Sequence, residues 1–135
     1  MTANKLLLDA SFIIAWLKIS DLEIPKEVLG KVIGADLFSA FVCRYEVGNT
    51  ILKYKKYLDK NMDSSFLFEQ VESLDISYLD IKNSNFILEV AEKYNLSFYD
   101  ASYFALMLES PEIDSLLTFD RDFSKVKSSK IQVLI

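Results

Sequence analysis

Four acidic residues from separate parts of the chain are the side chains best suited to catalysis: Asp9, Glu46, Asp100 and Asp120. Two carboxylates 4 Å apart repel each other by roughly 4 kcal/mol at an effective dielectric constant near 20. A cluster of such groups therefore requires protons or a multivalent cation. Mg²⁺ and Mn²⁺ prefer oxygen ligands of this kind. If the four side chains meet, they form a metal site of the type that hydrolyses phosphodiester bonds.

The residue types that the sequence lacks exclude most other catalytic sites. The chain has no histidine and a single cysteine, Cys43. Histidine-dependent triads and dyads are therefore impossible, as are disulfide frameworks and metal sites built from several cysteines. Only three glycines are present, and they form no glycine-rich turn that could bind a phosphate or a dinucleotide. Carboxylates, lysines, hydroxyls and a recruited cation are what remains for chemistry.

The elements that must position these acids follow from the apolar pattern. The 135 residues predict one domain spanning 1–135, and 51% of them are hydrophobic, as in a globular protein. Short apolar runs predict strands at 5–9, 36–40, 74–78, 115–118 and 131–135. Helical spacing predicts helices at 10–18, 25–33, 43–58, 63–73, about 87–94 and from 98 to 108. This alternation indicates an α/β fold with a mostly parallel sheet.

In open parallel sheets, ligands bind at the carboxyl ends of the strands. Asp9 ends the first strand, and Asp120 follows the strand that ends at Thr118, while Glu46 and Asp100 lie in the first turns of helices. Each acid also has a purely structural explanation. Asp9 and either Asp120 or Asp122 could cap helices, residues 97–100 match a capping box, and Glu46 could favour its helix dipole. Capping explains each acid singly, whereas a metal site explains why all four fall at one edge.

Four segments give the chain a resemblance to a known family. They are Leu6-Leu7-Leu8-Asp9-Ala10-Ser11, Tyr45-Glu46-Val47-Gly48-Asn49, Leu96-Ser97-Phe98-Tyr99-Asp100-Ala101-Ser102-Tyr103 and Leu117-Thr118-Phe119-Asp120-Arg121-Asp122-Phe123. In order and spacing they resemble the PIN-domain family, most closely its small toxin ribonucleases of the VapC type. The resemblance covers nearly the whole chain, from Lys5 to Ile135.

This resemblance implies a three-layer α/β/α sandwich with Asp9, Glu46, Asp100 and Asp120 forming an acidic metal pocket. Ser11 and Thr118 match its small hydroxyl positions, and Asn49 matches a polar helper one turn after the glutamate. Asp122 is left to replace or assist Asp120. The resemblance also implies a homodimer and an antitoxin protein that blocks the pocket.

The leading hypothesis is a toxin endoribonuclease that uses Mg²⁺ or Mn²⁺ to hydrolyse RNA. Asp9, Asp100 and Asp120 would hold the ion, and Glu46 would be a further ligand or the base that orients water. One alternative is a catalytically idle subunit that keeps the fold and binds partners through the apolar helices around Trp16 and Phe66–Phe68. Another keeps the metal chemistry but acts on DNA ends or structured RNA.

Charge suggests where an RNA would lie. The net charge is −5, yet residues 51–60 hold four lysines against one acid, and the tail from Arg121 also carries an excess of basic residues. Such runs are either solvated surface or patches that follow a polyanion. On the second interpretation the RNA-binding residues would be Lys53, Lys55, Lys56 and Arg121. We see no apolar run of transmembrane length and no export signal, and therefore expect a soluble, cytoplasmic protein without a membrane partner.

Overall fold

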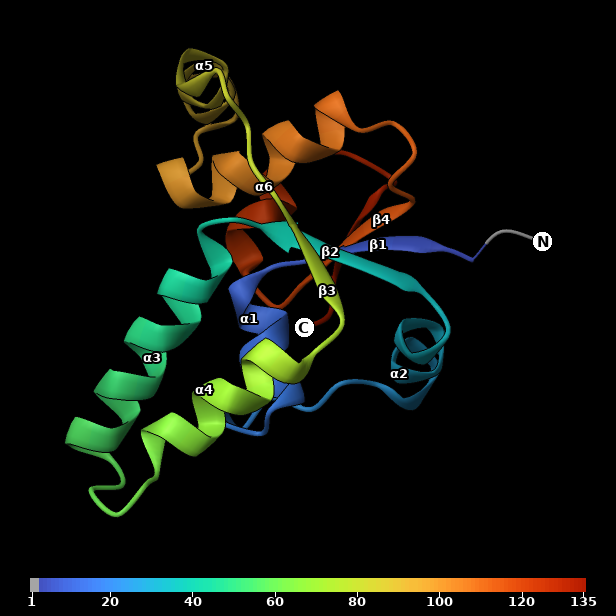
Figure 1. Cartoon of the computed structure of the whole chain (residues 1–135). Helices are drawn as coiled ribbons and strands as arrows, with labels where there is room; N and C mark the ends of the chain where they lie inside the picture. The colour runs from blue at the N-terminus through green and yellow to red at the C-terminus, as the bar shows by residue number, and fades with distance from the viewer. Residues whose placement is uncertain (1–2) are drawn as a thin grey trace.

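The computed structural model describes residues 3–135, in which five short strands alternate with helices (Figure 1). The strands are β1 (Lys5–Leu8), β2 (Asp36–Ala40), β3 (Ile76–Leu79), β4 (Ser115–Thr118) and β5 (Ile131–Val133). The α-helices are α1 (Ala10–Trp16), α2 (Lys26–Ile33), α3 (Cys43–Tyr57), α4 (Ser64–Ser73), α5 (Ser84–Tyr94) and α6 (Phe98–Glu109). A 3₁₀ helix, η1 (Arg121–Lys125), follows β4.

All five strands form one parallel sheet in the order β3-β2-β1-β4-β5. The central strand is β1, where Leu7 lies opposite Phe38 of β2 on one side and Leu116 of β4 on the other. Its three leucines are buried because helices cover both faces of the sheet. The predicted α/β architecture with a parallel sheet is therefore confirmed.

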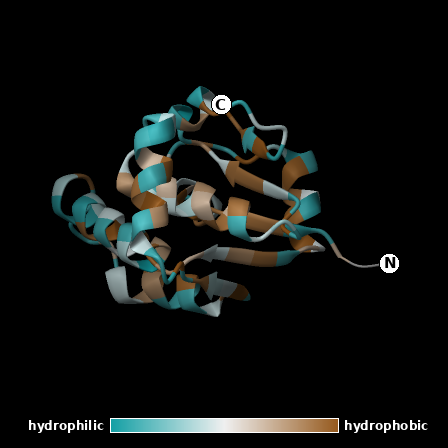
Figure 2. Ribbon diagram, turned by 90° about the horizontal axis from the view of Figure 1, so that it is seen from above, coloured by the Kyte–Doolittle hydropathy of each residue, from teal (hydrophilic) through white to brown (hydrophobic). Residues whose placement is uncertain are grey.

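Helices cover the sheet as two layers (Figure 1). Helices α5 and α6 pack on one face, and α1 to α4 lie on the other. Helix α6 is deeply buried along its middle, since every residue from Asp100 to Met107 is buried. Figure 2 shows hydrophobic residues concentrated on the strands and hydrophilic ones on the outer faces of the peripheral helices. Hydrophobic burial between these layers therefore fixes the positions of the strand ends.

Several element boundaries differ from the prediction for local physical reasons. Strand β1 ends at Leu8 because Asp9 caps helix α1, and α1 itself ends at Trp16, two residues before Lys18 with its left-handed φ of 58°. The strand predicted from residue 74 begins at Ile76, because Leu74 still caps α4. Within residues 3–135, no helix is both long enough and apolar enough to cross a membrane.

Candidate metal centre

Asp9 lies at the carboxyl end of the central strand and is almost completely buried, with 4% of its surface exposed. Its Oδ1 accepts hydrogen bonds from the Phe12 N–H, at 3.1 Å, and from the Ser11 hydroxyl, at 2.6 Å. Its Oδ2 accepts one from the Thr118 hydroxyl at the end of β4. Asp9 therefore caps α1, as the structural explanation expected, and is also tied to the neighbouring strand.

The hydroxyls of Ser11 and Thr118 connect Asp9 to the turn that carries the next acids. They lie 3.3 Å apart, and each also accepts a backbone N–H: Ser11 from Phe119 and Thr118 from Asp120, both at 2.9 Å. Side-chain hydrogen bonds thereby join the carboxyl ends of β1 and β4. This network fixes where Asp120 leaves the strand.

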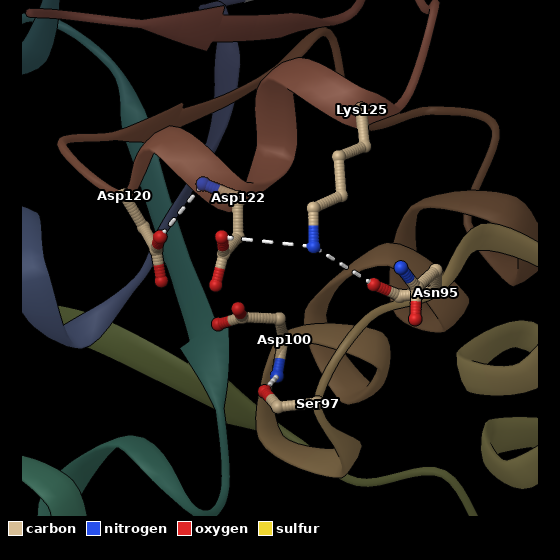
Figure 3. A network of polar contacts seen from close by, with 6 residues as sticks. All are labelled: Asn95, Ser97, Asp100, Asp120, Asp122 and Lys125. Atoms are coloured by element: carbon tan, nitrogen blue, oxygen red, sulfur yellow. Dashed lines mark hydrogen bonds and ion pairs between the residues drawn. The ribbon is translucent and has the colours of Figure 1, made fainter.

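Three carboxylates converge beside this network. Oxygen atoms of Asp100, Asp120 and Asp122 lie within 4.8 Å of one another, and Figure 3 shows the three side chains pointing toward a common centre. Asp120 also accepts the Asp122 N–H at 2.9 Å, which begins η1. Ser97 accepts the Asp100 N–H at 3.1 Å and so begins α6. Local capping thus orients the backbone from which each acid projects.

Glu46 approaches the same edge of the sheet from the first turn of α3. Its Oε1 accepts a 2.8 Å hydrogen bond from the hydroxyl of Tyr103, which is buried in α6. Glu46 lines a hollow of about 880 Å³ together with Asn49 and Tyr99. One carboxylate oxygen of Glu46 is therefore fixed by a hydrogen bond, and the residue also lines the hollow.

The electrostatics of the centre are those of crowded anions. Burial, together with the charge of Asp120, raises the pKa of Asp100 from 3.8 to about 7. Burial raises the pKa of Asp9 to about 6, although the hydrogen bonds from Ser11, Thr118 and Phe12 lower it in part. Burial also raises the pKa of Glu46, and the charges of Asp9 and Asp120 add to this rise. Neighbouring carboxylates therefore add to the effect of burial in disfavouring the ionisation of Asp9, Glu46 and Asp100.

The donor set fits a hard divalent cation. The ligand atoms that Asp100, Asp120 and Asp122 offer are all carboxylate oxygens, which Mg²⁺ and Mn²⁺ favour. A bound cation would also offset the repulsion that disfavours ionisation of Asp100. The arrangement can therefore hold a metal ion, with Asp9 and Glu46 at its border.

Comparisons with known proteins agree with this geometry. The family model for the PIN domain matches residues 6–128. The chain belongs to the PIN-domain family. The crystal structure of PAE2754 from Pyrobaculum aerophilum is similar, with a TM-score of 0.70 and 26% sequence identity over 96% of this chain and 90% of that one. No curated protein matches the chain in sequence. PIN domains are typically metal-dependent nucleases, and the acidic cluster is consistent with that chemistry.

The PIN fold brings the predicted acids to one edge but groups them unevenly. Asp100 and Asp120 join Asp122, which the sequence left as an alternative or an assistant, whereas Asp9 and Glu46 lie outside this group of three. Ser11 and Thr118 bond to Asp9 directly. Asn49 is exposed and lines the hollow beside Glu46. The structure therefore assigns both Asp120 and Asp122 to the neighbourhood of Asp100.

The predicted RNA-binding residues lie at different distances from the three clustered aspartates. Arg121 is exposed on η1, between Asp120 and Asp122. Lys53, Lys55 and Lys56 occupy the later turns of α3, whose axis rises about 1.5 Å per residue. They therefore lie roughly 10 to 15 Å beyond Glu46 along the helix. Only a substrate several nucleotides long could contact both the acids and these lysines.

Two residues of the centre were not predicted from the sequence. Tyr103 belongs to a segment that carries the family resemblance but received no role of its own, and only its distance of three residues from Asp100, on the same helix face, could have suggested one. Lys125 read as part of a basic tail, yet its Nζ lies 3.8 Å from Asp122 Oδ1 and donates to the Asn95 carbonyl at 3.2 Å (Figure 3). A lysine three residues after an aspartate is too common a pattern to identify this contact.

Proposed function

We propose that this PIN domain is an endoribonuclease that requires Mg²⁺ or Mn²⁺ and serves as the toxin of a toxin–antitoxin pair. The observation that carries the proposal is the convergence of Asp100, Asp120 and Asp122 within 4.8 Å. Oxygen-only donor sets of this kind support phosphoryl-transfer chemistry. The absence of histidine from the chain leaves carboxylates as the available proton acceptors.

The surroundings of each acid indicate its role in the proposed reaction. The three clustered aspartates would hold the cation, which when bound lowers the pKa of water and neutralises charge on the phosphate. Asp9 is fixed by three hydrogen bonds, and so it holds negative charge at a constant position at the border of the centre. Glu46 is oriented by Tyr103, and its raised pKa suits it to accept a proton from attacking water.

RNA is the proposed substrate because basic residues lie both beside the acids and farther along α3. Arg121 lies within the acidic turn and the three lysines of α3 lie farther out, an arrangement that suits a flexible polyanion. Exposed apolar side chains on α3 and α4, including Leu52, Leu58 and Phe66, support the proposed contacts with an antitoxin or a second copy of the chain.

The experiment is a cleavage assay with end-labelled single-stranded RNA in Mn²⁺, in Mg²⁺ and in EDTA. We expect cleavage only with a divalent ion, and at least a 100-fold loss for Asp100→Asn and for Asp120→Asn. Asp75→Asn changes an exposed acid before β3 and serves as the matched control. Parallel reactions with single-stranded DNA, duplex DNA and duplex RNA test the substrate class. No cleavage and no effect of Mn²⁺ on the melting temperature would favour the interaction subunit instead.

A further inference from the structure

A second hollow, of about 580 Å³, lies at the carboxyl ends of β2 and β3 beside the start of α6. Its buried lining includes the apolar residues Ala40, Ile81 and Leu106 together with one polar residue, Ser102. The mechanism proposed for the acidic centre does not use this hollow. Its volume lies within the range of sites that take small ligands or cofactors.

Three exposed aromatic rings border this hollow: Phe41, Phe98 and Tyr99. Their exposed fractions are 44%, 49% and 56%. A single exposed aromatic residue is ordinary, but three around one apolar hollow form a surface suited to binding. Flat rings at the rim and an apolar floor suit a planar ligand that stacks on them.

The hollow adjoins the one that contains Glu46, at the border of the acidic centre. Tyr99 lines both this hollow and the one that contains Glu46, and it directly precedes Asp100 in α6. Val42 is likewise shared by the two hollows. A substrate whose phosphate lies at the acidic centre therefore has this hollow as its neighbouring binding surface.

We propose that the hollow bordered by Phe41, Phe98 and Tyr99 binds an unpaired nucleobase of the RNA, an inference that rests on the proposed ribonuclease function. Base–aromatic stacking suits such a site because every base has a π-face. Cations lie close by: Lys82 lines the hollow, and the Arg44 guanidinium is 5.4 Å from the centroid of the Phe41 ring. They can neutralise the phosphates on either side of the base.

The hollow favours a base over a segment of a partner protein. An amphipathic helix needs a groove that accepts successive turns, whereas this hollow is compact and borders the acidic centre through Tyr99. A base paired within a duplex cannot present its face to the rings, since both faces are stacked. The site would therefore restrict cleavage to loops and single strands.

The test measures RNA affinity without cleavage. Fluorescence anisotropy of a labelled single-stranded RNA of random sequence, in EDTA, compares the parent with Phe98→Ala and Phe41→Ala. Stacking of one base is worth about 1 to 3 kcal/mol, which corresponds to about 5- to 150-fold weaker binding. Phe98→Tyr should restore affinity, and Leu108→Ala, which removes a comparably exposed apolar side chain from the other end of α6, should leave it unchanged. A 2-aminopurine placed in the RNA should lose fluorescence on binding the parent and not on binding Phe98→Ala.

The outcomes separate this inference from the ribonuclease proposal. Equal affinity of the parent, Phe98→Ala and Phe41→Ala for the single strand overturns the base site, even if the parent cleaves RNA in Mn²⁺. If the parent binds RNA more tightly than Phe98→Ala and Phe41→Ala but cleaves no RNA, the base site is supported and the nuclease proposal is refuted. Unchanged RNA affinity together with lost binding of a co-expressed protein partner assigns the hollow to that partner and also overturns the base site. An unaltered thermal shift by Mn²⁺ verifies that each variant keeps its acidic centre.

Discussion

Replacing Asp100 with asparagine should stabilise the metal-free protein at pH 8. Burial and the charge of Asp120 raise the pKa of the Asp100 carboxyl from 3.8 to about 7 in the folded protein. Because the folded-state pKa is the higher one, ionisation destabilises the folded state. The penalty is absent below about pH 4, grows between pH 4 and pH 7, and is constant at higher pH. Asparagine carries no charge at any of these values.

The magnitude follows from the size of this shift. A rise of about 3 pKa units corresponds to about 4 kcal/mol at pH 8. Solvent at the open rim screens part of the repulsion, and we therefore expect a gain of about 1 to 2 kcal/mol from Asp100→Asn. For a chain of 135 residues, an unfolding entropy of about 2.1 cal/mol/K per residue converts this gain to a rise of about 4 to 7 °C in melting temperature.

The assay is thermal unfolding followed by circular dichroism in EDTA. Asp100→Asn should melt above the parent at pH 8, and the difference should shrink at pH 4.5, while the exposed control Asp75→Asn should match the parent at both values. Adding Mn²⁺ should then raise the melting temperature of the parent but not that of Asp100→Asn. A variant that melts at or below the parent in EDTA at pH 8 would refute the idea that Asp100 lies in a crowded acidic cluster.

The remaining predictions test the rest of the site. Millimolar Mn²⁺ should stabilise the parent at pH 8, by about 2.7 kcal/mol at one hundred times its Kd. Its affinity, measured by calorimetry, should fall between pH 7 and pH 6, where Asp100 takes up a proton; an affinity independent of pH would exclude Asp100 as a ligand. Thr118→Val removes the donor to Asp9 Oδ2 and should cost about 2 kcal/mol in urea unfolding, whereas Thr118→Ser should cost less. Tyr103→Phe leaves Glu46 without its donor and should cost about 1 to 2 kcal/mol in the same assay; an unchanged urea midpoint would contradict the contact. Replacing Lys53, Lys55 and Lys56 of α3 with alanine should reduce the slope of log K against log salt concentration for single-stranded RNA binding by about 2. An unchanged slope would show that these lysines are ordinary surface residues.

The fold could be predicted because its signals are local and mutually consistent. The continuous apolar run at Leu6–Leu8 is typical of a strand covered on both faces, and it became the centre of the sheet. Asp9 follows this apolar run, and Thr118 ends the apolar run at residues 115–118. Because β1 and β4 pair in parallel, Asp9 and Thr118 lie at the same edge of the sheet. The sequence thus predicted which edge carries polar side chains.

The finer arrangement of the centre depends on tertiary packing and could not be predicted. Asp120 and Asp122 occur in one short turn, and only the path of η1 decides that both face Asp100. The contact between Tyr103 and Glu46 joins residues 57 apart in sequence and depends on how α3 and α6 sit across the sheet. Charge counting likewise described Lys125 as surface, because the Asn95 carbonyl to which its Nζ donates lies 30 residues earlier in the sequence.

The order of the strands has a consequence for synthesis of the protein. The central strand β1 is made first, but the Thr118 hydroxyl that binds Asp9 belongs to a residue 109 positions later. A growing or truncated chain that stops before β4 leaves one edge of β1 unpaired and lacks Asp120 and Asp122 altogether. The cluster of Asp100, Asp120 and Asp122 therefore forms only once β4 and the start of η1 have been made.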